Sequence, residues 1–142
     1  MVCFSARARD AVGNVSPWSA DSCVARPLDD RVLSTRGAVT RATGSGFYLG
    51  TATRSATRGA SFTRTGVLPG RVAVVVSTGR GYGSIGAYYN GRLVRTLSLA
   101  SVHSLNRRVV QLPWMQARGT ITFKVLTNGK PVVIDGLLLA RS

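Results

Sequence analysis

Residues 84–99 read SIGAYYNGRLVRTLSL, and this stretch decides the fold. Asn90-Gly91 is the residue pair that two-residue β-turns prefer, because a type I′ turn needs positive φ at both central positions. Aromatic, β-branched and other apolar residues flank the pair on both sides, which is the composition of paired strands. We therefore predict a β-hairpin whose strands run over residues 84–89 and 92–99.

A second Asn-Gly pair, Asn128-Gly129, separates two further apolar stretches. The same reasoning predicts a hairpin of residues 120–127 and 130–140. In the first of these stretches Ile121, Phe123 and Val125 alternate with Thr120, Thr122 and Lys124, so one face of the strand is expected to be wet. Four more strands are expected over residues 47–55, 60–65, 71–77 and 107–112, and the run Val72–Val76 is apolar on both faces, which is typical of a central strand.

The composition excludes a helical protein. Among 142 residues there are sixteen glycines and no glutamate, and serine, threonine and valine are abundant. Helix surfaces use glutamate, lysine and alanine, whereas strands favour β-branched residues. Hydrophobic residues make up 44% of the chain, which is enough for a packed core. The expected fold class is all-β, with about eight short strands at the spacing of a β-sandwich.

The net positive charge is confined to one part of the chain. Up to Leu33 four arginines are balanced by four aspartates, so the later residues carry the whole net charge of +14. Such a field attracts polyanions at low salt, including nucleic acid, acidic cell-wall polymers and sulfated or uronic sugars. The alternative is a merely solvated surface in a protein whose composition favours arginine over lysine.

The first residues predict a separate pair of strands. Residues 2–9 alternate between apolar and polar side chains, turn residues follow at 10–14, and a second short strand is expected near residues 22–25. Pairing of these strands brings Cys3 and Cys23 opposite each other. A disulfide closing a loop of about twenty residues contributes roughly 3 kcal/mol and belongs to an oxidising compartment.

This segment resembles the last two strands of a fibronectin type III domain. The resemblance rests on Phe4-Ser5-Ala6-Arg7-Ala8-Arg9-Asp10, on Gly13-Asn14-Val15-Ser16 and on Trp18-Ser19, and it covers residues 2–28. It implies a truncated domain, because the first five strands are missing. We therefore assign residues 1–28 to a fibronectin type III fragment and residues 29–43, which begin with the charged run Asp29-Asp30-Arg31, to a linker.

Residues 44–142 resemble the galactose-binding-like β-sandwiches, the jelly rolls of many carbohydrate-binding modules. The resemblance rests on Phe47-Tyr48-Leu49-Gly50-Thr51, Tyr88-Tyr89-Asn90-Gly91 and Val133-Ile134-Asp135-Gly136-Leu137, in that order. Fibronectin type III segments followed by such sandwiches are frequent in secreted bacterial proteins. The resemblance implies an extracellular or cell-surface location within a larger multidomain chain.

The residues needed for catalysis are not present in a usable pattern. Glycoside hydrolysis typically needs two carboxylates, and the predicted sandwich contains only Asp135. His103 is the only histidine, it has no predicted acid partner, and it is expected in a solvated loop. Two cysteines and one histidine do not complete a zinc site. We predict a protein that is not an enzyme and uses no cofactor.

Four residues are candidates for contact with a ligand. Arg80 and Tyr82 share the flexible segment Gly79–Gly83, where arginine and tyrosine can hold anions and stack on sugars or bases. Tyr88 and its neighbour Tyr89 point to opposite faces of one strand, so only one of them can belong to an outer face. Trp114 is either a stacking platform at a loop or a plug of the core.

The preferred function is that of a non-catalytic accessory or adhesion module that binds polysaccharide or another extracellular polymer. A structural spacer without a ligand is one alternative, and nonspecific binding of polyanions or nucleic acid is another. The chain has no apolar run of the roughly 20 residues that a membrane span needs. It also begins without a signal peptide, which we expect to have been lost with a missing N-terminus.

Overall fold

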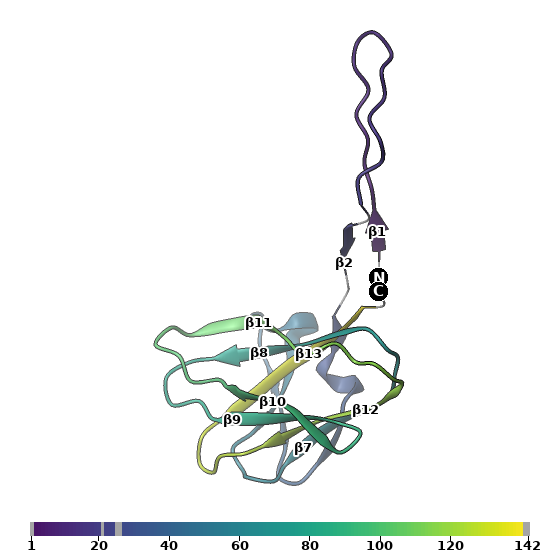
Figure 1. Ribbon diagram of the computed structural model, residues 1–142. Helices are drawn as coiled ribbons and strands as arrows, with labels where there is room; N and C mark the ends of the chain where they lie inside the picture. Colours follow the sequence, from purple (N-terminus) through teal and green to yellow (C-terminus); the bar gives the residue numbers. More distant parts are fainter. Residues whose placement is uncertain (1, 21, 25–26, 141–142) are drawn as a thin grey trace.

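The computed structural model describes residues 2–20, 22–24 and 27–140, with side chains for residues 4–20 and 27–140. Within this part of the chain no helix is of a length and hydropathy suited to crossing a membrane. The described residues form a thin N-terminal hairpin that stands away from a β-sandwich (Figure 1). The hairpin contains β1 (Val2–Phe4) and β2 (Ser22–Val24).

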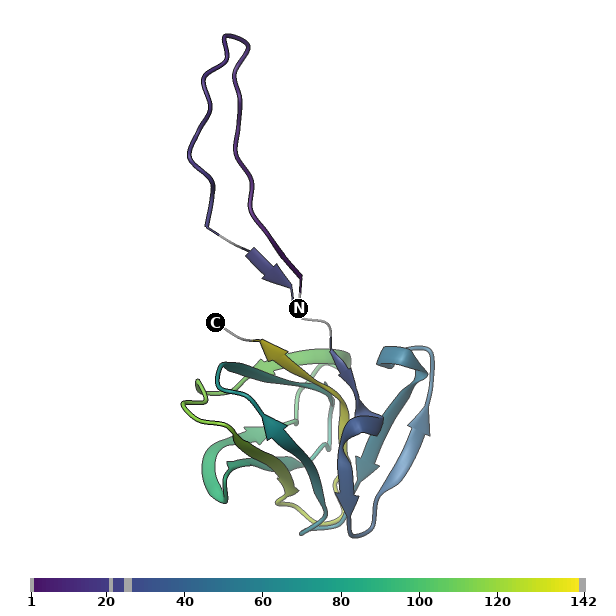
Figure 2. The same cartoon turned by 90° about the vertical axis from the view of Figure 1, so that its right-hand side faces the viewer.

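The sandwich consists of two antiparallel sheets that face each other (Figure 2). The five-stranded sheet has the order β10-β9-β12-β7-β4, and the six-stranded sheet has the order β11-β8-β13-β6-β5, with β3 also paired to β13. The strands are β3 (Leu28–Asp29), β4 (Ser34–Arg36), β5 (Thr40–Thr43), β6 (Thr51–Ser55), β7 (Ser61–Val67), β8 (Arg71–Thr78), β9 (Ser84–Tyr89), β10 (Arg92–Ser98), β11 (Leu105–Gln111), β12 (Gly119–Val125) and β13 (Val132–Ala140). Two 3₁₀ turns, η1 (Asp30–Val32) and η2 (Tyr48–Gly50), complete the sandwich.

The core lies between the two sheets and explains their alternating sequences. Phe62 of β7 and Phe123 of β12 are opposite each other in register, and both are completely buried. From the other sheet, alternate residues of β8 and β13 point into the same core. Each fully buried large apolar side chain contributes about 1.5–3 kcal/mol, so these strands supply much of the stability of the sandwich.

The structure confirms the all-β class and the predicted hairpin around Asn90-Gly91. The strands β9 and β10 pair antiparallel, and Asn90 and Gly91 have φ values of 51° and 80°. Positive φ at both central residues is the requirement of a type I′ turn. The run 72–76 lies inside β8, which pairs on both sides and is buried from residue 72 to residue 78.

The predicted second hairpin is wrong. The strands on either side of Asn128-Gly129 belong to different sheets: β12 pairs with β7 and β9, whereas β13 pairs with β8, β6 and β3. Both edges of β12 are already occupied, and the almost wholly apolar β13 is buried on both faces at the centre of the other sheet. Only Gly129 of the pair has a positive φ, so the segment connects two layers instead of closing a hairpin.

The predicted linker over residues 29–43 is also a part of the sandwich. Its residues form β4 and β5 at the edges of the two sheets, and Asp29 pairs with Gly136 of β13. The two aspartates of the charged run are not solvated: both are buried, and Asp30 accepts hydrogen bonds from Thr51 and Thr53. The predicted strand over 47–55 correspondingly starts only at Thr51, after η2.

The hairpin at the N-terminus is held by its own backbone, by two serine hydroxyls and by one carboxylate. Asp10 accepts hydrogen bonds from the side-chain amide of Asn14 at 2.8 Å and from the backbone N–H groups of Asn14 and Val12 at 2.8 and 3.0 Å. These hydrogen bonds, that from the Asn14 side chain foremost, lower the pKa of Asp10. All side chains of residues 4–20 are exposed, including Phe4 at 58% and Trp18 at 61%. The hairpin therefore has large apolar side chains without a covering layer.

Cys3 of β1 lies directly opposite Cys23 of β2 in the backbone register. Their side chains lie outside the described residues, so the disulfide stays a prediction.

Candidate functional site

The outer face of the five-stranded sheet carries two rows of side chains that cross neighbouring strands. In an antiparallel sheet, residues directly opposite each other project from the same face. Register places the first row across β4, β7, β12 and β9 as Arg36, Ser61, Lys124 and Gly86. The second row, across the same strands and β10, consists of Ser34, Thr63, Thr122, Tyr88 and Leu93.

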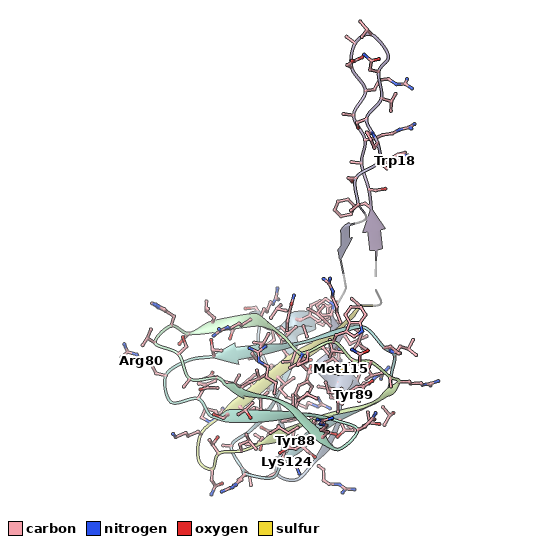
Figure 3. All side chains as sticks on the ribbon, in the orientation of Figure 1. Trp18, Arg80, Tyr88, Tyr89, Met115 and Lys124 are labelled. Carbon is pink, nitrogen blue, oxygen red and sulfur yellow. The ribbon has the colours of Figure 1, made fainter. Side chains whose placement is uncertain are left out.

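Tyr88 is an aromatic platform whose position depends on Gly86. A Cβ atom at residue 86 would lie 2.9 Å from Cε2 of Tyr88, closer than carbon atoms can approach, so the ring lies over the glycine. Leu93 of β10 flanks the same place. The Nζ atom of Lys124 is 5.3 Å from the ring centroid, which is a cation–π distance. Figure 3 shows Tyr88 and Lys124 close together on this sheet.

A polar groove of about 610 Å³ extends over β4, β7 and β12 beside this platform. Its lining is dominated by hydroxyl groups, and the hydroxyls of Thr63 and Thr122 are 3.2 Å apart in a hydrogen bond. Two cations, Arg36 and Lys124, also line it. The lining residues are Ser34, Thr35, Arg36, Gly59, Ser61, Thr63, Thr65, Thr122 and Lys124. We call this surface, together with Tyr88, the hydroxyl groove.

Tyr89 anchors the strand that presents Tyr88. Its ring belongs to the core, and its hydroxyl donates to the backbone carbonyls of Val67 and Ala117. Burial raises the pKa of the Tyr89 hydroxyl. The two adjacent tyrosines thus face opposite ways, as the alternation of a strand requires, and Tyr88 is the one that faces solvent.

The other candidates from the sequence do not join Tyr88. Tyr82 is partly buried and packs against the core. Its Cε1 atom would lie 3.1 Å from a Cβ atom at residue 79, so the ring lies directly against Gly79. Arg80 is exposed in the connection between β8 and β9, well away from Tyr88 in Figure 3. The structure therefore separates Arg80 and Tyr82 from the hydroxyl groove.

Trp114 belongs to a second pocket, which adjoins the six-stranded sheet. The pocket holds about 330 Å³ and is lined by residues of β8, β11 and β13 together with Leu112 and Trp114. The tryptophan is 41% exposed, and Arg71 and Gln111 supply polar groups beside it. Tyr88 lies on the outer face of the five-stranded sheet, whereas Trp114 lies in the connection between β11 and β12, beside the six-stranded sheet, so they do not form one site.

Sequence reasoning missed most of the hydroxyl groove. Alternation in residues 120–125 did place Thr122 and Lys124 on a wet face, but Ser34 and Arg36 fell in the predicted linker. The signal available was the alternation of hydroxyl residues at 61, 63 and 65 beside the buried Phe62. Strand order and register, which bring these residues into rows, are not visible in the sequence.

The carboxylates of the sandwich are structural. Asp30 accepts hydrogen bonds from Thr51, Thr53 and Arg41, and it forms an ion pair of 2.9 Å with Nη1 of Arg41. Asp135 is completely buried and accepts the N–H of Tyr48 at 2.9 Å. Burial raises the pKa of Asp135, and the hydrogen bond from Tyr48 only partly opposes that effect.

No group of three or more potential metal ligands occurs among residues 2–20, 22–24 and 27–140. His103 is exposed, and its backbone N–H bonds to the hydroxyl of Ser101. None of the carboxylates of the sandwich lines the hydroxyl groove. The groove thus offers hydrogen bonds, one aromatic ring and positive charge, a set of groups suited to binding.

Comparison with solved structures shows the fold of the sandwich. An exo-β-1,3-galactanase from Phanerochaete chrysosporium, solved with galactose, superimposes with a TM-score of 0.65 at 17% identity. The alignment covers 86% of this chain and 30% of the galactanase, so the chain spans about a third of that enzyme. No protein-family model matches the chain, and a search of curated proteins finds no match in sequence.

Two smaller proteins match over nearly their whole length. A family 6 carbohydrate-binding module from Clostridium stercorarium, solved with cellobiose, has a TM-score of 0.60 at 15% identity and covers 82% of this chain and 94% of the module. The C-terminal family 6 module of a marine laminarinase from Zobellia galactanivorans has a TM-score of 0.61 at 11% identity, with coverage of 81% and 98%. The sandwich therefore has the fold of family 6 carbohydrate-binding modules.

Proposed function

We propose that the chain is a carbohydrate-binding module whose ligand lies in the hydroxyl groove. The observation that carries the proposal is the Tyr88 ring, which lies over Gly86 beside a surface of serine and threonine hydroxyls. An aromatic face packs against the C–H face of a sugar, and hydroxyl groups exchange hydrogen bonds with sugar hydroxyls. The fold shared with family 6 carbohydrate-binding modules supports the same conclusion.

We further propose that the module serves as a non-catalytic accessory part of a secreted or cell-surface protein. The resemblance of residues 2–28 to the end of a fibronectin type III domain supports this context, as does the pairing of β1 with β2 that sets Cys3 opposite Cys23. The exposed Phe4 and Trp18 support packing of the hairpin against further strands of a larger multidomain protein.

Cosedimentation with insoluble polysaccharides at about 1 M salt tests the proposed function. At that ionic strength the Debye length is about 3 Å, so retention reports contacts other than long-range charge. Tyr88→Ala should weaken retention at least about tenfold, because a central aromatic anchor carries more than about 1.4 kcal/mol of binding free energy. Trp114→Ala, which removes an exposed aromatic residue from the pocket beside the six-stranded sheet, is the matched control and should leave retention unchanged.

Gly86→Ala tests the geometry of the platform. The φ of Gly86 is not positive, so alanine fits the backbone, but its Cβ displaces the Tyr88 ring. We expect weaker binding with an unchanged melting temperature. If Tyr88→Ala and Gly86→Ala bind as the unsubstituted protein does while Trp114→Ala does not, the ligand lies at the six-stranded sheet and the proposed site is wrong.

A further inference from the structure

We propose that the ligand of the hydroxyl groove is an acidic glycan, a polysaccharide that bears carboxylate or sulfate groups. This inference rests on the proposed function, because it assigns the chemical class of the carbohydrate bound at the same site. It is carried by the placement of cations around the groove and by the positions of the carboxylates of the sandwich.

Two cations flank the hydroxyls of the groove in a single row. Arg36 and Lys124 are each directly opposite Ser61 in register, one on β4 and the other on β12. Two strand spacings separate them, or about 9.5 Å between Cα atoms. Neither forms an ion pair within the described part of the chain. An anionic group that lies over Ser61 can therefore receive a hydroxyl hydrogen bond and positive charge from both sides.

The five-stranded sheet contains no acidic residue in any of its strands. All three carboxylates between residues 27 and 140, those of Asp29, Asp30 and Asp135, are buried. In the same part of the chain, every charged side chain that is exposed belongs to arginine or lysine. The exposed charges of the sandwich are thus all positive, which favours an anionic polymer over a neutral one.

Lys124 joins the charge to the aromatic platform. Its ammonium group is near the Tyr88 ring and also lines the groove. A sugar stacked on Tyr88 therefore places an acidic substituent within reach of Lys124, while the next part of the chain passes over the hydroxyls toward Arg36. One ligand can use the ring, the hydroxyls and both cations together.

A glycan fits this surface better than a nucleic acid does. Proteins that hold single strands stack successive bases on several aromatic side chains. Among the described residues that form the groove, Tyr88 is the only aromatic one, whereas hydroxyl side chains extend along three strands. Sugars exchange hydrogen bonds with such hydroxyls along their whole length.

The test compares polygalacturonate with its methyl-esterified form, which has the same backbone without the charge. Affinity is measured by isothermal titration from about 0.1 M salt, where the Debye length is about 10 Å, up to 1 M. At the lower salt concentration, we expect the unsubstituted protein to bind polygalacturonate at least about tenfold more tightly than it binds the methyl-esterified form. The double variant Arg36→Gln/Lys124→Gln should lose this preference for the acidic polymer. The slope of its log affinity against log salt concentration should become shallower by about 1 to 2.

The matched control is Arg80→Gln/Arg108→Gln, which removes the same charge from two exposed positions outside the groove. It should keep the preference for the acidic polymer. An equal loss in the control pair overturns the assignment of the anion to the groove. Tighter binding of DNA than of polygalacturonate, with the same dependence on Arg36 and Lys124, overturns the glycan class.

The two proposals fail in different ways. If the protein binds both forms of the polymer with equal affinity, and Tyr88→Ala abolishes that binding, the proposal of an acidic ligand is wrong. The proposal of carbohydrate binding in the groove is then kept. Binding of neither form, together with no retention on any insoluble polysaccharide, overturns the proposed function as well.

Discussion

Replacement of Asp30 by alanine should destabilise the sandwich strongly, although the sequence around it has the composition of a linker. The carboxylate is completely buried and accepts hydrogen bonds of 2.7 Å from Thr51 and 2.6 Å from Thr53. It also pairs with Arg41 of β5. Asp30 thus ties η1 to β6 and β5 at one edge of the six-stranded sheet.

The expected loss follows from these contacts. Hydrogen bonds to a charged group contribute about 1.5–3 kcal/mol each, and removal of one partner from a buried ion pair costs about 3–5 kcal/mol. The side chain of Arg41 is 41% exposed and recovers water when Asp30 is removed, which reduces the cost. We therefore expect Asp30→Ala to lower the free energy of unfolding by about 3 kcal/mol. In a domain of this size the melting temperature falls by about 10 °C.

Urea denaturation of Asp30→Ala, followed by circular dichroism, measures this loss. The control is Arg31→Gln, which breaks the pair between Arg31 and Asp29. The Arg31 side chain is 59% exposed, so this change should lower the free energy of unfolding far less than Asp30→Ala does. A loss below about 1 kcal/mol for Asp30→Ala would show that residues 29–43 are not an integral part of the sandwich.

Three further predictions concern stability. Removal of residues 1–26 should shift the melting temperature by only a few degrees, because every side chain of residues 4–20 is exposed; unfolding of the shortened chain would contradict this. Thr78→Val should raise the free energy of unfolding by about 1 kcal/mol, because Oγ1 of Thr78 is buried without a hydrogen-bond partner. Thermal denaturation measures this change, and a lower free energy of unfolding in the variant would contradict the reasoning. Burial raises the pKa of Asp135 in the folded protein, so the protonated carboxyl favours folding. This contribution to stability is complete below about pH 4, the pKa of the carboxyl in the unfolded chain, and it is lost as the pH rises through the pKa in the folded protein. The melting temperature of Asp135→Asn relative to the unsubstituted protein should therefore increase over that interval, and a constant difference would refute the assignment.

Local turn chemistry predicted one hairpin correctly and failed at the other for a physical reason. At Asn90-Gly91 both residues adopt positive φ, and β10 is an edge strand whose natural partner is its neighbour in sequence. At Asn128-Gly129 the following strand, β13, is apolar on both faces and is buried at the centre of the opposite sheet. The gain from burying β13 exceeds the preference of the turn, and this competition between distant strands cannot be evaluated from the turn residues.

The linker prediction failed because it rested on the local sequence, a charged run without an apolar period, whereas the segment is held by contacts with distant strands. Asp29 and Asp30 are buried, and their partners Arg31, Arg41 and Thr53 come from the same segment and from β6. Burial alone would raise the pKa of Asp29, but the hydrogen bonds it accepts, that from Arg31 foremost, lower it overall. Buried carboxylates are tolerated when they are paired in this way, and pairing is a property of the folded chain.

The candidate site was predictable only in its parts. Alternation indicated that Tyr88 and Tyr89 face opposite ways, without deciding which of them is outward, and it indicated a wet face with Lys124. The position of the Tyr88 ring depends on Gly86, and the row that joins Arg36 to Lys124 depends on the order of three strands that are distant in sequence. Such rows arise from the register between strands. The sequence therefore contains the residues of a row but does not show which of them become neighbours.

The most direct test of carbohydrate binding at the hydroxyl groove is a map of amide chemical shifts during titration with an oligogalacturonate. Binding there predicts that the perturbed amides cluster at residues 34–36, 61–65, 86–88 and 120–124. It also predicts that the amides around Trp114 stay unchanged. Shifts that cluster around Trp114, or that spread over all exposed arginines without a focus on Tyr88, would contradict a ligand site on the five-stranded sheet.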